Sequence, residues 1–406
     1  MMLPRIPQGV DFRRLLIARL VTTLAGAGTP VLLTLTVLAH GGSFQVLGLV
    51  LGVGSLPGIV SVLASGSLFR RVSATRLMFW LDVTGCGVCA VLCVMDFGGG
   101  LRVPMLTAAS LVVATAQGLA YPASGLIMPK VLPREDLQAG NALRSLVGSV
   151  AGIVGPATVT VLLAVSVESV AWGVVAVAFG VGAMLIRRVS VVAVVSGDGD
   201  DDRVWPQLRA GWSYFWGRRW IAQVVVLAGV WHVFVWAFVL VLGPVVLQTD
   251  HGDAISWGAF ETLLGVGGVL GGIVGGRLRC RRLIMASLAC LFPGVAVGVA
   301  LAAGAPIAVV LLLSGCVGAS LGLAGIFWPT AMQALVPEDR LAQMFSYDYL
   351  LSEAVMPFGL LLAPLAAAWC GPHLALAIGC LSTGVLMVAS LASPPLRVPV
   401  VLTETT

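Results

Sequence analysis

The most constraining feature of this sequence is the length of its uncharged stretches. From Leu20 to Phe69 there is no Asp, Glu, Lys or Arg, and the stretch from Leu283 to Pro337 is equally free of them. A helix that crosses the hydrocarbon core of a bilayer needs about 20 apolar residues, so each stretch can hold two such helices. Only 10% of the 406 residues are charged, whereas soluble domains carry about 25%. The composition therefore predicts an integral membrane protein.

Turn signals divide the apolar stretches into single spans. Turns rich in Gly or Pro at His40–Ser43, Gly304–Pro306 and Cys370–His373 separate neighbouring spans. The first apolar run lacks a cleavage pattern of small residues, so it is interpreted as a retained helix rather than a secretory signal. The sequence thus predicts an all-α integral membrane fold with twelve transmembrane helices. The first two lie within residues 20–69, and the others lie at roughly 77–95, 103–123, 141–165, 168–187, 221–247, 255–276, 283–303, 306–332, 344–369 and 372–392.

Residues 188–220 differ from the spans on either side. The run from Gly197 to Asp202 contains only Gly and Asp, which indicates a hydrated linker. Further on, apolar side chains recur every three or four residues, which predicts an amphipathic helix at the membrane interface; a hydrated loop with scattered aromatic residues is the alternative. These side chains are Leu208, Trp212, Phe215, Trp216 and Trp220. The predicted organisation is a half of six helices (1–187), a cytoplasmic linker (188–220) and a second half of six helices (221–406).

Basic residues are distributed unevenly between the two sides of the predicted membrane. Of the 23 Lys and Arg residues, only Arg102 lies in a connection that follows an odd-numbered span. Cytoplasmic connections carry an excess of Lys and Arg. We therefore expect a multi-pass protein of the cell (plasma) membrane with both termini in the cytoplasm.

The two predicted halves repeat each other at an offset of about 205 residues. Pro133–Leu137 after the fourth span matches Pro337–Leu341 after the tenth, and Arg76–Met78 matches Arg282–Met285. Parallel repeats of this kind are one standard construction of secondary transporters, with the substrate site between the repeats near mid-bilayer. The repeat predicts two pseudo-symmetric six-helix bundles.

Several stretches, taken together, resemble a known family. They are Phe12–Leu20 leading into Thr29-Pro30, Gly66–Arg76, Tyr121–Leu143 and Gly152–Pro156. With them the chain resembles the major facilitator superfamily, and within it the bacterial drug-efflux and siderophore-exporter branch, over nearly its whole length. The resemblance implies the major facilitator fold and a central site that opens alternately to the two sides of the membrane.

The resemblance also implies that the fifth helix packs on the eighth between the halves. Small residues at every fourth position let membrane helices approach closely. The residues expected in this helix packing are Gly152, Gly155 and Pro156 in the fifth span and Gly268, Gly272 and Gly276 in the eighth.

Two departures from the family pattern bear on gating and coupling. Gly66, Arg71 and Arg76 match the family's gating loop, but Arg70 stands where members usually have an acid. The family's acid in the first helix is also replaced, at or near Ala27. The roles of those two acids therefore do not transfer to this chain, which leaves a degenerate transporter open.

Three carboxylates inside predicted spans are candidates for proton coupling: Glu353, Glu261 and Asp348. A charged residue at the centre of a spanning helix costs about 2.5–3.5 kcal/mol on insertion scales, so it is a functional candidate by default. A structural partner for a nearby arginine or backbone group is the alternative for each. A fourth acid, Asp82, is expected to pair with an arginine of a loop.

Four further residues are candidates for lining a substrate cavity: Gln117, His232, Trp236 and Arg19. The alternatives are a helix–helix hydrogen bond for Gln117, a packed histidine for His232, and for Arg19 a side chain that extends to the cytoplasmic surface.

The function predicted from these features is that of a proton-coupled exporter of a small organic or antibiotic-like molecule, with import left open. The alternatives are a degenerate, non-transporting facilitator-like protein or sensor, and an integral-membrane transferase. The chain lacks a phosphate-binding Gly-rich loop with its Lys. We expect no enzymatic activity, no cofactor, no metal and no nucleic acid; the expected partners of this monomer are the lipid bilayer, a small-molecule substrate and protons.

Overall fold

The computed structural model of this protein describes residues 9–40, 72–189, 204–251 and 255–397. These residues form helices and no strand. Ten helical segments among them are long and apolar enough to cross a membrane, and Val103–Val113 is a shorter apolar helix. The all-helical, multi-pass membrane fold is thereby confirmed. The second predicted span, together with Gly66, Arg70 and Arg71, lies outside the described residues.

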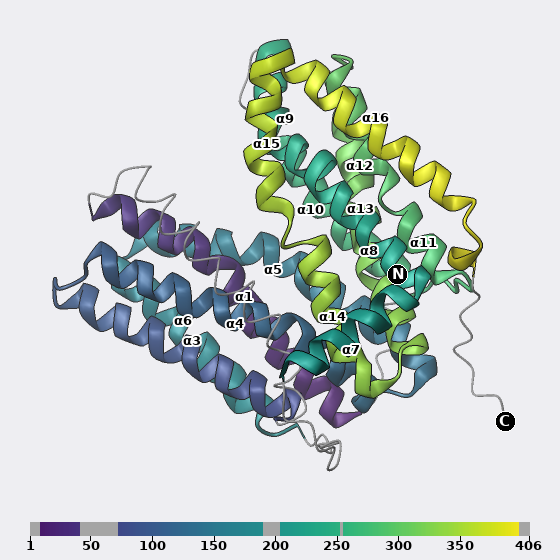
Figure 1. The fold of residues 1–406 in the computed structure, drawn as a ribbon. Helices are drawn as coiled ribbons and strands as arrows, with labels where there is room; N and C mark the ends of the chain where they lie inside the picture. The colour runs from purple at the N-terminus through teal and green to yellow at the C-terminus, as the bar shows by residue number, and fades with distance from the viewer. Residues whose placement is uncertain (1–8, 41–71, 190–203, 252–254, 398–406) are drawn as a thin grey trace.

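The helices fall into two groups (Figure 1). In the first group, α1 contacts α5 and α6, and α3 contacts α4 and α6. One short segment, η1 (Arg134–Asp136), joins α4 to α5. The helices of this first group are α1 (Val10–Ala39), α3 (Ala74–Phe97), α4 (Val103–Val131), α5 (Leu137–Val165) and α6 (Glu168–Ile186).

The second group is built from shorter pieces. Its helices are α8 (Arg219–Trp231), the π-helix η2 (His232–Trp236), α9 (Ala237–His251), α10 (Ile255–Gly275), α11 (Leu283–Ala289), α12 (Phe292–Ala302), α13 (Ile307–Leu335), α14 (Glu338–Ser352), α15 (Met356–Cys370) and α16 (Pro372–Leu391), followed by η3 (Pro394–Arg397).

Two spans predicted as single helices are interrupted in the second group. The span at 283–303 is divided into α11 and α12, and α12 has a proline in its first turn, Pro293. The span at 344–369 is divided into α14 and α15 at residues 353–355, and α15 likewise has a proline in its first turn, Pro357. Proline has no N–H to donate and clashes with the preceding turn, so both divisions fall where the helix loses a hydrogen bond.

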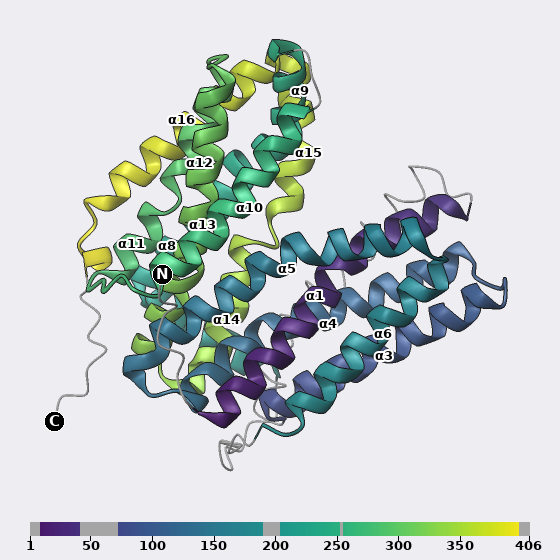
Figure 2. The same ribbon diagram turned by 180° about the vertical axis from the view of Figure 1, so that it is seen from behind.

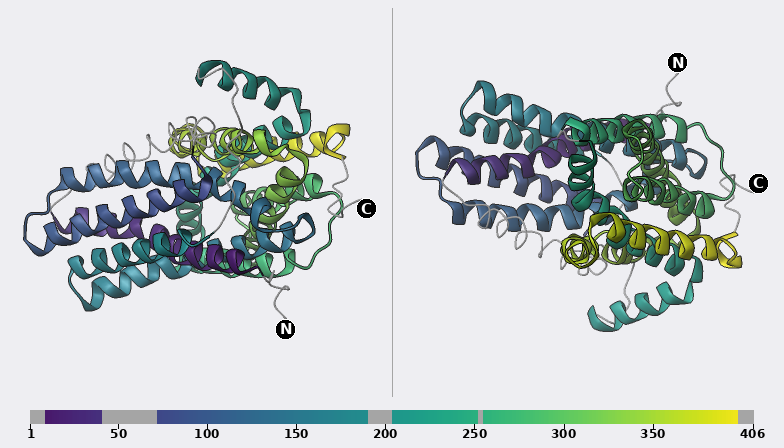
Figure 3. Two further views of the ribbon diagram at one scale, coloured as in Figure 1. Left: turned by 90° about the horizontal axis from the view of Figure 1, so that it is seen from below. Right: turned by 90° about the horizontal axis from the view of Figure 1, so that it is seen from above.

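The two groups touch at one end and diverge at the other, as Figure 1 and the reverse view in Figure 2 both show. At the end that we call the contact end, α5 packs on α10 and α13, and α4 packs on α14. A single buried cluster there combines Met78 of α3 and Ile127 of α4 with Phe345 of α14. Toward the other end, which we call the open end, each group has a separate buried cluster. Seen from below and from above, the helices of the first group extend to one side of the second group (Figure 3).

Helix α7 (Val204–Gly217) covers part of the predicted amphipathic segment and lies against α14 and α8. Phe215 is fully buried and packs on Tyr347 with ring centroids 5.9 Å apart. Trp212 and Trp216 remain 41% and 48% exposed. The helix is therefore one-sided as expected, and its position at a membrane interface stays a prediction.

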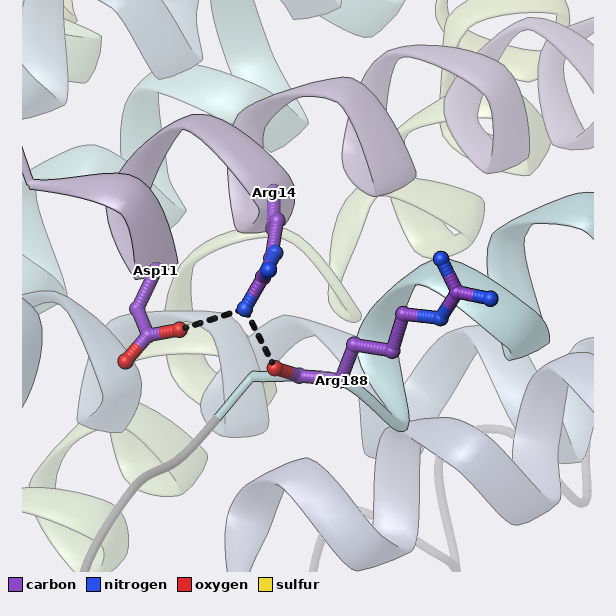
Figure 4. Close-up of polar contacts among 3 residues, drawn as sticks. All are labelled: Asp11, Arg14 and Arg188. Atoms are coloured by element: carbon purple, nitrogen blue, oxygen red, sulfur yellow. Dashed lines mark hydrogen bonds and ion pairs between the residues drawn. The ribbon is translucent and has the colours of Figure 1, made fainter.

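The start of α1 is tied to the end of α6 at the contact end. The Nη1 atom of Arg14 donates to the carbonyl oxygen of Arg188 at 3.2 Å and lies 3.5 Å from Oδ1 of Asp11 (Figure 4). Arg14 is exposed, so the ion pair contributes little on its own, but the backbone contact joins the first and last helices of the first group.

Candidate functional site

A cavity of about 560 Å³ lies between the two groups, bounded by α5 on one side and by α8, α10, α13 and α14 on the other. We call it the central cavity. Most of its wall is apolar or glycine, and four of its residues carry a charged or imidazole side chain. These four are Arg144 from the first group and His232, Asp348 and Glu353 from the second.

Glu353 owes its position to the interruption between α14 and α15. It directly follows the last residue of α14, its side chain is exposed, and it lines the central cavity. Asp348 lies on α14 and is only 4% exposed; its Oδ2 accepts a hydrogen bond of 2.9 Å from Nε1 of Trp328. Two of the three carboxylates predicted from the sequence therefore meet at the same cavity, one exposed to it and one already hydrogen-bonded.

Arg144 is the charged residue that the sequence analysis did not single out. It lies on α5, donates to the carbonyl oxygen of Gly325 at 3.4 Å, and is close enough to Glu353 for the two charges to interact. In the sequence, Arg144 is one of the 22 Lys and Arg residues assigned to the cytoplasmic side. The sequence signal that could have identified Arg144 as a site residue is its position, four residues inside the predicted span 141–165. The structure therefore places a cation of one group opposite a carboxylate of the other.

His232 is at the start of the π-helix η2, and its ring lines the central cavity. Its Nδ1 lies 2.8 Å from the carbonyl oxygen of Ala228. The wider π turn also allows Trp231 and Trp236, five residues apart, to stack with centroids 5.7 Å apart. Trp236 packs in an apolar cluster with Trp231 and is not among the described residues that line the central cavity. A cavity role for Trp236 stays a prediction.

Arg19 and Asp82 line a second, smaller cavity of about 230 Å³ inside the first group. Asp82 is 6% exposed, and Arg19 is close enough for the two charges to attract. Among the described residues, the cation that acts on Asp82 is thus Arg19 of α1 rather than a loop arginine. Arg70 and Arg71 of the loop lie outside the described residues. The same attraction gives Arg19 an acidic partner inside the first group.

The remaining predicted residues lie apart from the central cavity or outside the described part. Glu261 is exposed on α10 and is not among the described residues that line the cavity. Gln117 lies on α4, but its side chain is outside the described part of the chain. Arg76 is exposed in the first turn of α3, where its backbone N–H donates to Oγ of Ser73 at 3.3 Å.

The contact between α5 and α10 forms, but not through the glycines expected on α5. The glycines of α10 do pack there: Gly272 faces Leu146, Gly268 faces Ser149 and Gly265 faces Ile153. The three α5 residues are spaced by three and four, which places them on one face of that helix. Larger side chains of α5 thus fill the space that the α10 glycines leave.

The glycines of α5 face elsewhere. A Cβ atom at Gly155 would lie only 2.6 Å from the carbonyl oxygen of Leu24, so Gly155 allows α5 to approach α1. A Cβ atom at Gly152 would meet nothing within 4 Å. Pro156 is half-buried one residue beyond Gly155, and Gly276 follows α10, where its N–H donates to Gly272 O at 3.3 Å. The expected packing of Gly152 and Gly155 on the eighth span is therefore wrong.

Polar side chains of α5 cross to the second group along the contact end. Asn141 is fully buried, and its Nδ2 donates to Oγ1 of Thr330 at 2.9 Å and to Oε1 of Gln333 at 2.7 Å. Nearer the start of α5, Nε2 of Gln138 donates to Gly275 O at 2.9 Å; further along, Oγ of Ser145 donates to Gly322 O at 3.0 Å. We call the α5 residues Gln138, Asn141, Arg144 and Ser145 the polar seam. They hold the contact end closed.

Comparison with known proteins agrees with this architecture. The sequence matches the profile of the Major Facilitator Superfamily over residues 15–360. None of the curated protein sequences compared with it matches.

Among solved structures, a bacterial homologue of the iron transporter ferroportin in the outward-facing state is similar, with a TM-score of 0.73 and 15% identity over 93% of this chain and 98% of that chain. The transporter FucP in the outward conformation is similar with a TM-score of 0.71 and 13% identity over 93% and 97%. The proton:xylose symporter XylE, bound to 6-bromo-6-deoxy-D-glucose, gives 0.67 and 13% over 94% and 95%. At these identities the likeness concerns the fold.

Proposed function

The chain belongs to the Major Facilitator Superfamily, and on that premise we propose that it is a proton-coupled exporter of a small organic or antibiotic-like molecule, which works by alternating access. The observation that carries this proposal is the central cavity, where Arg144 of the first group meets Asp348 and Glu353 of the second. Ionisable residues at membrane depth are costly and line transport pathways, and here both groups contribute them to one space.

The size and lining of the central cavity support an organic substrate. Cavities that hold drug-sized ligands measure about 300–1,000 Å³ and combine apolar walls with a few polar groups. The central cavity has a volume of about 560 Å³, with Leu264, Leu291 and Trp328 beside its charged residues. The proposed partners are therefore this substrate, protons and the lipid bilayer around a monomeric chain.

The proposed orientation places the contact end in the cytoplasm. Arg134 and Arg282 lie in connections at this end and Arg340 lies in the first turn of α14, and cytoplasmic connections are rich in Lys and Arg. The cavity would then open to the outside, and both termini would lie in the cytoplasm of a cell (plasma) membrane. In a cysteine-free protein, single cysteines at Gly42, Glu168 and Asp253 should all react with an impermeant reagent added outside. A cysteine that reacts only from the cytoplasm would overturn this orientation.

The proposed transport is tested in vesicles with the purified protein and an imposed pH gradient. A panel of antibiotic-like compounds is offered, and substrate accumulation and proton flux are recorded together. We expect at least one compound to accumulate against its gradient, with a matching proton flux in the opposite direction. Accumulation that is indifferent to the pH gradient would contradict proton coupling while leaving transport intact.

A specific observation supports a second candidate function, that of a facilitator-like protein without transport. The acids that the family carries in the first helix and in the loop after the second are replaced here, at Ala27 and Arg70. A sensor of this kind would bind a compound from the panel but accumulate none. Binding measured by equilibrium dialysis beside the vesicle assay separates the two functions.

A further inference from the structure

Three ionisable side chains meet at the open end of the first group. His40 directly follows α1, Asp96 lies in the last turn of α3, and Glu168 is the first residue of α6. The Nε2 of His40 lies 3.5 Å from Oδ1 of Asp96, and its Nδ1 lies 3.6 Å from Oε2 of Glu168. The three side chains are only 13–28% exposed. Three helix ends thus bring one imidazole and two carboxylates together, well away from the central cavity.

Among the described residues, no Lys or Arg forms an ion pair with Asp96 or Glu168. The Oε2 atom of Glu168 is buried, and the described polar groups beside this carboxylate are His40, Thr36 and Asp96. Two carboxylates this close repel each other, and partial burial strengthens the repulsion. The cluster therefore favours a bound cation.

The imidazole is oriented as a metal ligand would be. Its Nδ1 lies 3.0 Å from the carbonyl oxygen of Thr36, one turn earlier on α1. A ring protonated at Nδ1 donates to that carbonyl and leaves the Nε2 lone pair on the side of Asp96. Histidines that bind metals almost always donate their other ring N–H to a carbonyl or carboxylate in this way.

We propose that His40, Asp96 and Glu168 bind a divalent transition-metal ion of the Zn²⁺ or Mn²⁺ type. One ligand atom from each residue can be chosen so that all three lie within 4.8 Å of one another. Zinc–ligand distances are about 2.0–2.2 Å. His40 Nε2 and Asp96 Oδ1 need only small shifts to reach one ion, and Glu168, whose Oε2 lies beside Nδ1, would turn its carboxylate toward Nε2 to complete the set. A mixed set of imidazole and carboxylate ligands suits such ions, whereas Mg²⁺ prefers oxygen ligands and keeps its water. The bound ion would join the ends of α1, α3 and α6.

The second group offers a natural control at its own open end. Nε2 of His373, in the first turn of α16, lies 3.1 Å from Oδ2 of Asp250 on α9. No third ligand completes this pair among the described residues. It therefore has the same chemistry as the proposed site but one ligand too few.

The test uses the full chain in lipid nanodiscs, stripped with EDTA and titrated with Zn²⁺ or Mn²⁺ by equilibrium dialysis. We expect one saturable ion per chain and a rise in Tm on binding. His40→Ala, Asp96→Asn and Glu168→Gln should each weaken binding at least tenfold. His373→Ala should bind as the wild type does. Size-exclusion profiles and the metal-free Tm of each variant show that it is folded.

A second variant distinguishes this site from the central cavity. The double variant Asp348→Asn/Glu353→Gln removes both cavity carboxylates and should bind the ion unchanged. Loss of binding in this double variant, or unchanged binding in His40→Ala, would overturn the proposal. So would a wild-type protein that retains no ion after dialysis. None of these outcomes depends on whether the protein transports a substrate.

Discussion

The two halves of helix α5 have opposite surroundings. The first half crosses to the second group through the polar seam, with Asn141 fully buried between Thr330 and Gln333. The second half is held by α1 through Gly155, and its Val154 and Val161 are 43% and 59% exposed. The contact end is therefore closed by these hydrogen bonds together with the apolar cluster that both groups share, whereas the second half of α5 has exposed apolar side chains toward the open end.

This difference bears on transport, because in alternating access the contact end must open and the open end must close. A hydrogen bond contributes only about 0.5–1.5 kcal/mol net, so the polar seam is strong enough to specify a closed state and weak enough to break. The helix divisions of the second group, at residues 353–355 and in the π-helix η2, lie beside the cavity. Helix interruptions of this kind mark binding sites in transporters.

The largest expected effect comes from Glu353, whose carboxylate lies opposite Arg144 of α5 at the central cavity. Glu353→Gln keeps the shape of the side chain but fixes it in a neutral form, so it removes the attraction to Arg144 and the proton carrier together. We expect accumulation driven by a pH gradient in vesicles to fall at least tenfold, while downhill exchange of substrate continues.

Asp348→Asn is the matched control for that variant. An amide oxygen can still accept the hydrogen bond from Trp328, so we expect at least half of the wild-type accumulation. The reverse result, an inactive Asp348→Asn and an active Glu353→Gln, would assign the proton to Asp348 instead.

The second prediction breaks the polar seam directly. Asn141→Ala leaves the buried side chains of Thr330 and Gln333 without their donor, which costs about 1–3 kcal/mol. The equilibrium should shift by about 5- to 150-fold toward a separated contact end. Spin labels at Arg134 and Glu338, both exposed there, should report a longer distance.

Thr158→Ala is the control on the open half of the same helix. The Oγ1 of Thr158 donates only to Val154 O, at 2.7 Å within α5, and the residue is exposed. Its removal should leave the label distance unchanged. Equal shifts in Asn141→Ala and Thr158→Ala would show that the polar seam has no special role.

The sequence predicted the all-helical membrane fold and the family, because long apolar runs and a repeated loop pattern are strong signals. It did not predict which helices touch. Asp82 was assigned to a loop arginine because the sequence does not show that Arg19 of α1 and Asp82 of α3 line one cavity. Arg144 was overlooked because a basic residue near a helix end is normally a surface residue.

Other features depend on side-chain packing that no sequence spacing reveals. The glycines of the fifth span were expected on the eighth, but Gly155 packs on α1 because it lies on another face of α5 than the side chains that meet α10. The cluster of His40, Asp96 and Glu168 comes from three distant segments, so the sequence analysis predicted no metal site. Glu353 was identified as a candidate from the sequence, because a carboxylate in an apolar span stands out whatever the direction of its side chain.

The third prediction tests the two packing surfaces through their glycines. A Cβ atom at Gly155 would lie 2.6 Å from Leu24 O, whereas one at Gly272 would lie 3.5 Å from Leu146. Gly155→Ala should lower the free energy of unfolding by about 1–3 kcal/mol, as overpacking does. Gly272→Ala should stay within about 0.5 kcal/mol of the wild type, the range of substitutions that disturb no packing. Thermal unfolding in nanodiscs measures both, and a more stable Gly155→Ala would contradict the close contact of α5 with α1.

The smallest expected effect is that of Glu261, which should meet the second half of α5 when the open end closes. Glu261 lies four residues before Gly265, hence on the face of α10 that packs on α5, and it is exposed where the two groups diverge. Closing the open end would bring this carboxylate against the apolar second half of α5. Burying a charge costs more than burying an amide, so Glu261→Gln should favour closure a few-fold. Spin labels at Phe97 and Trp369, which are 86% and 95% exposed, should then move closer together.

Glu261→Asp keeps the charge and serves as the control, with label distances like those of the wild type. A Glu261→Gln protein that closes no more readily would show that the carboxylate stays in water throughout the cycle. A Glu261→Gln protein that also loses accumulation, as expected of Glu353→Gln, would place a second proton site on the open half of the interface. In that case each half of α5 would face a carboxylate that must be neutralised before that end can close. The two halves would then differ only in the step of the transport cycle at which their carboxylate is neutralised.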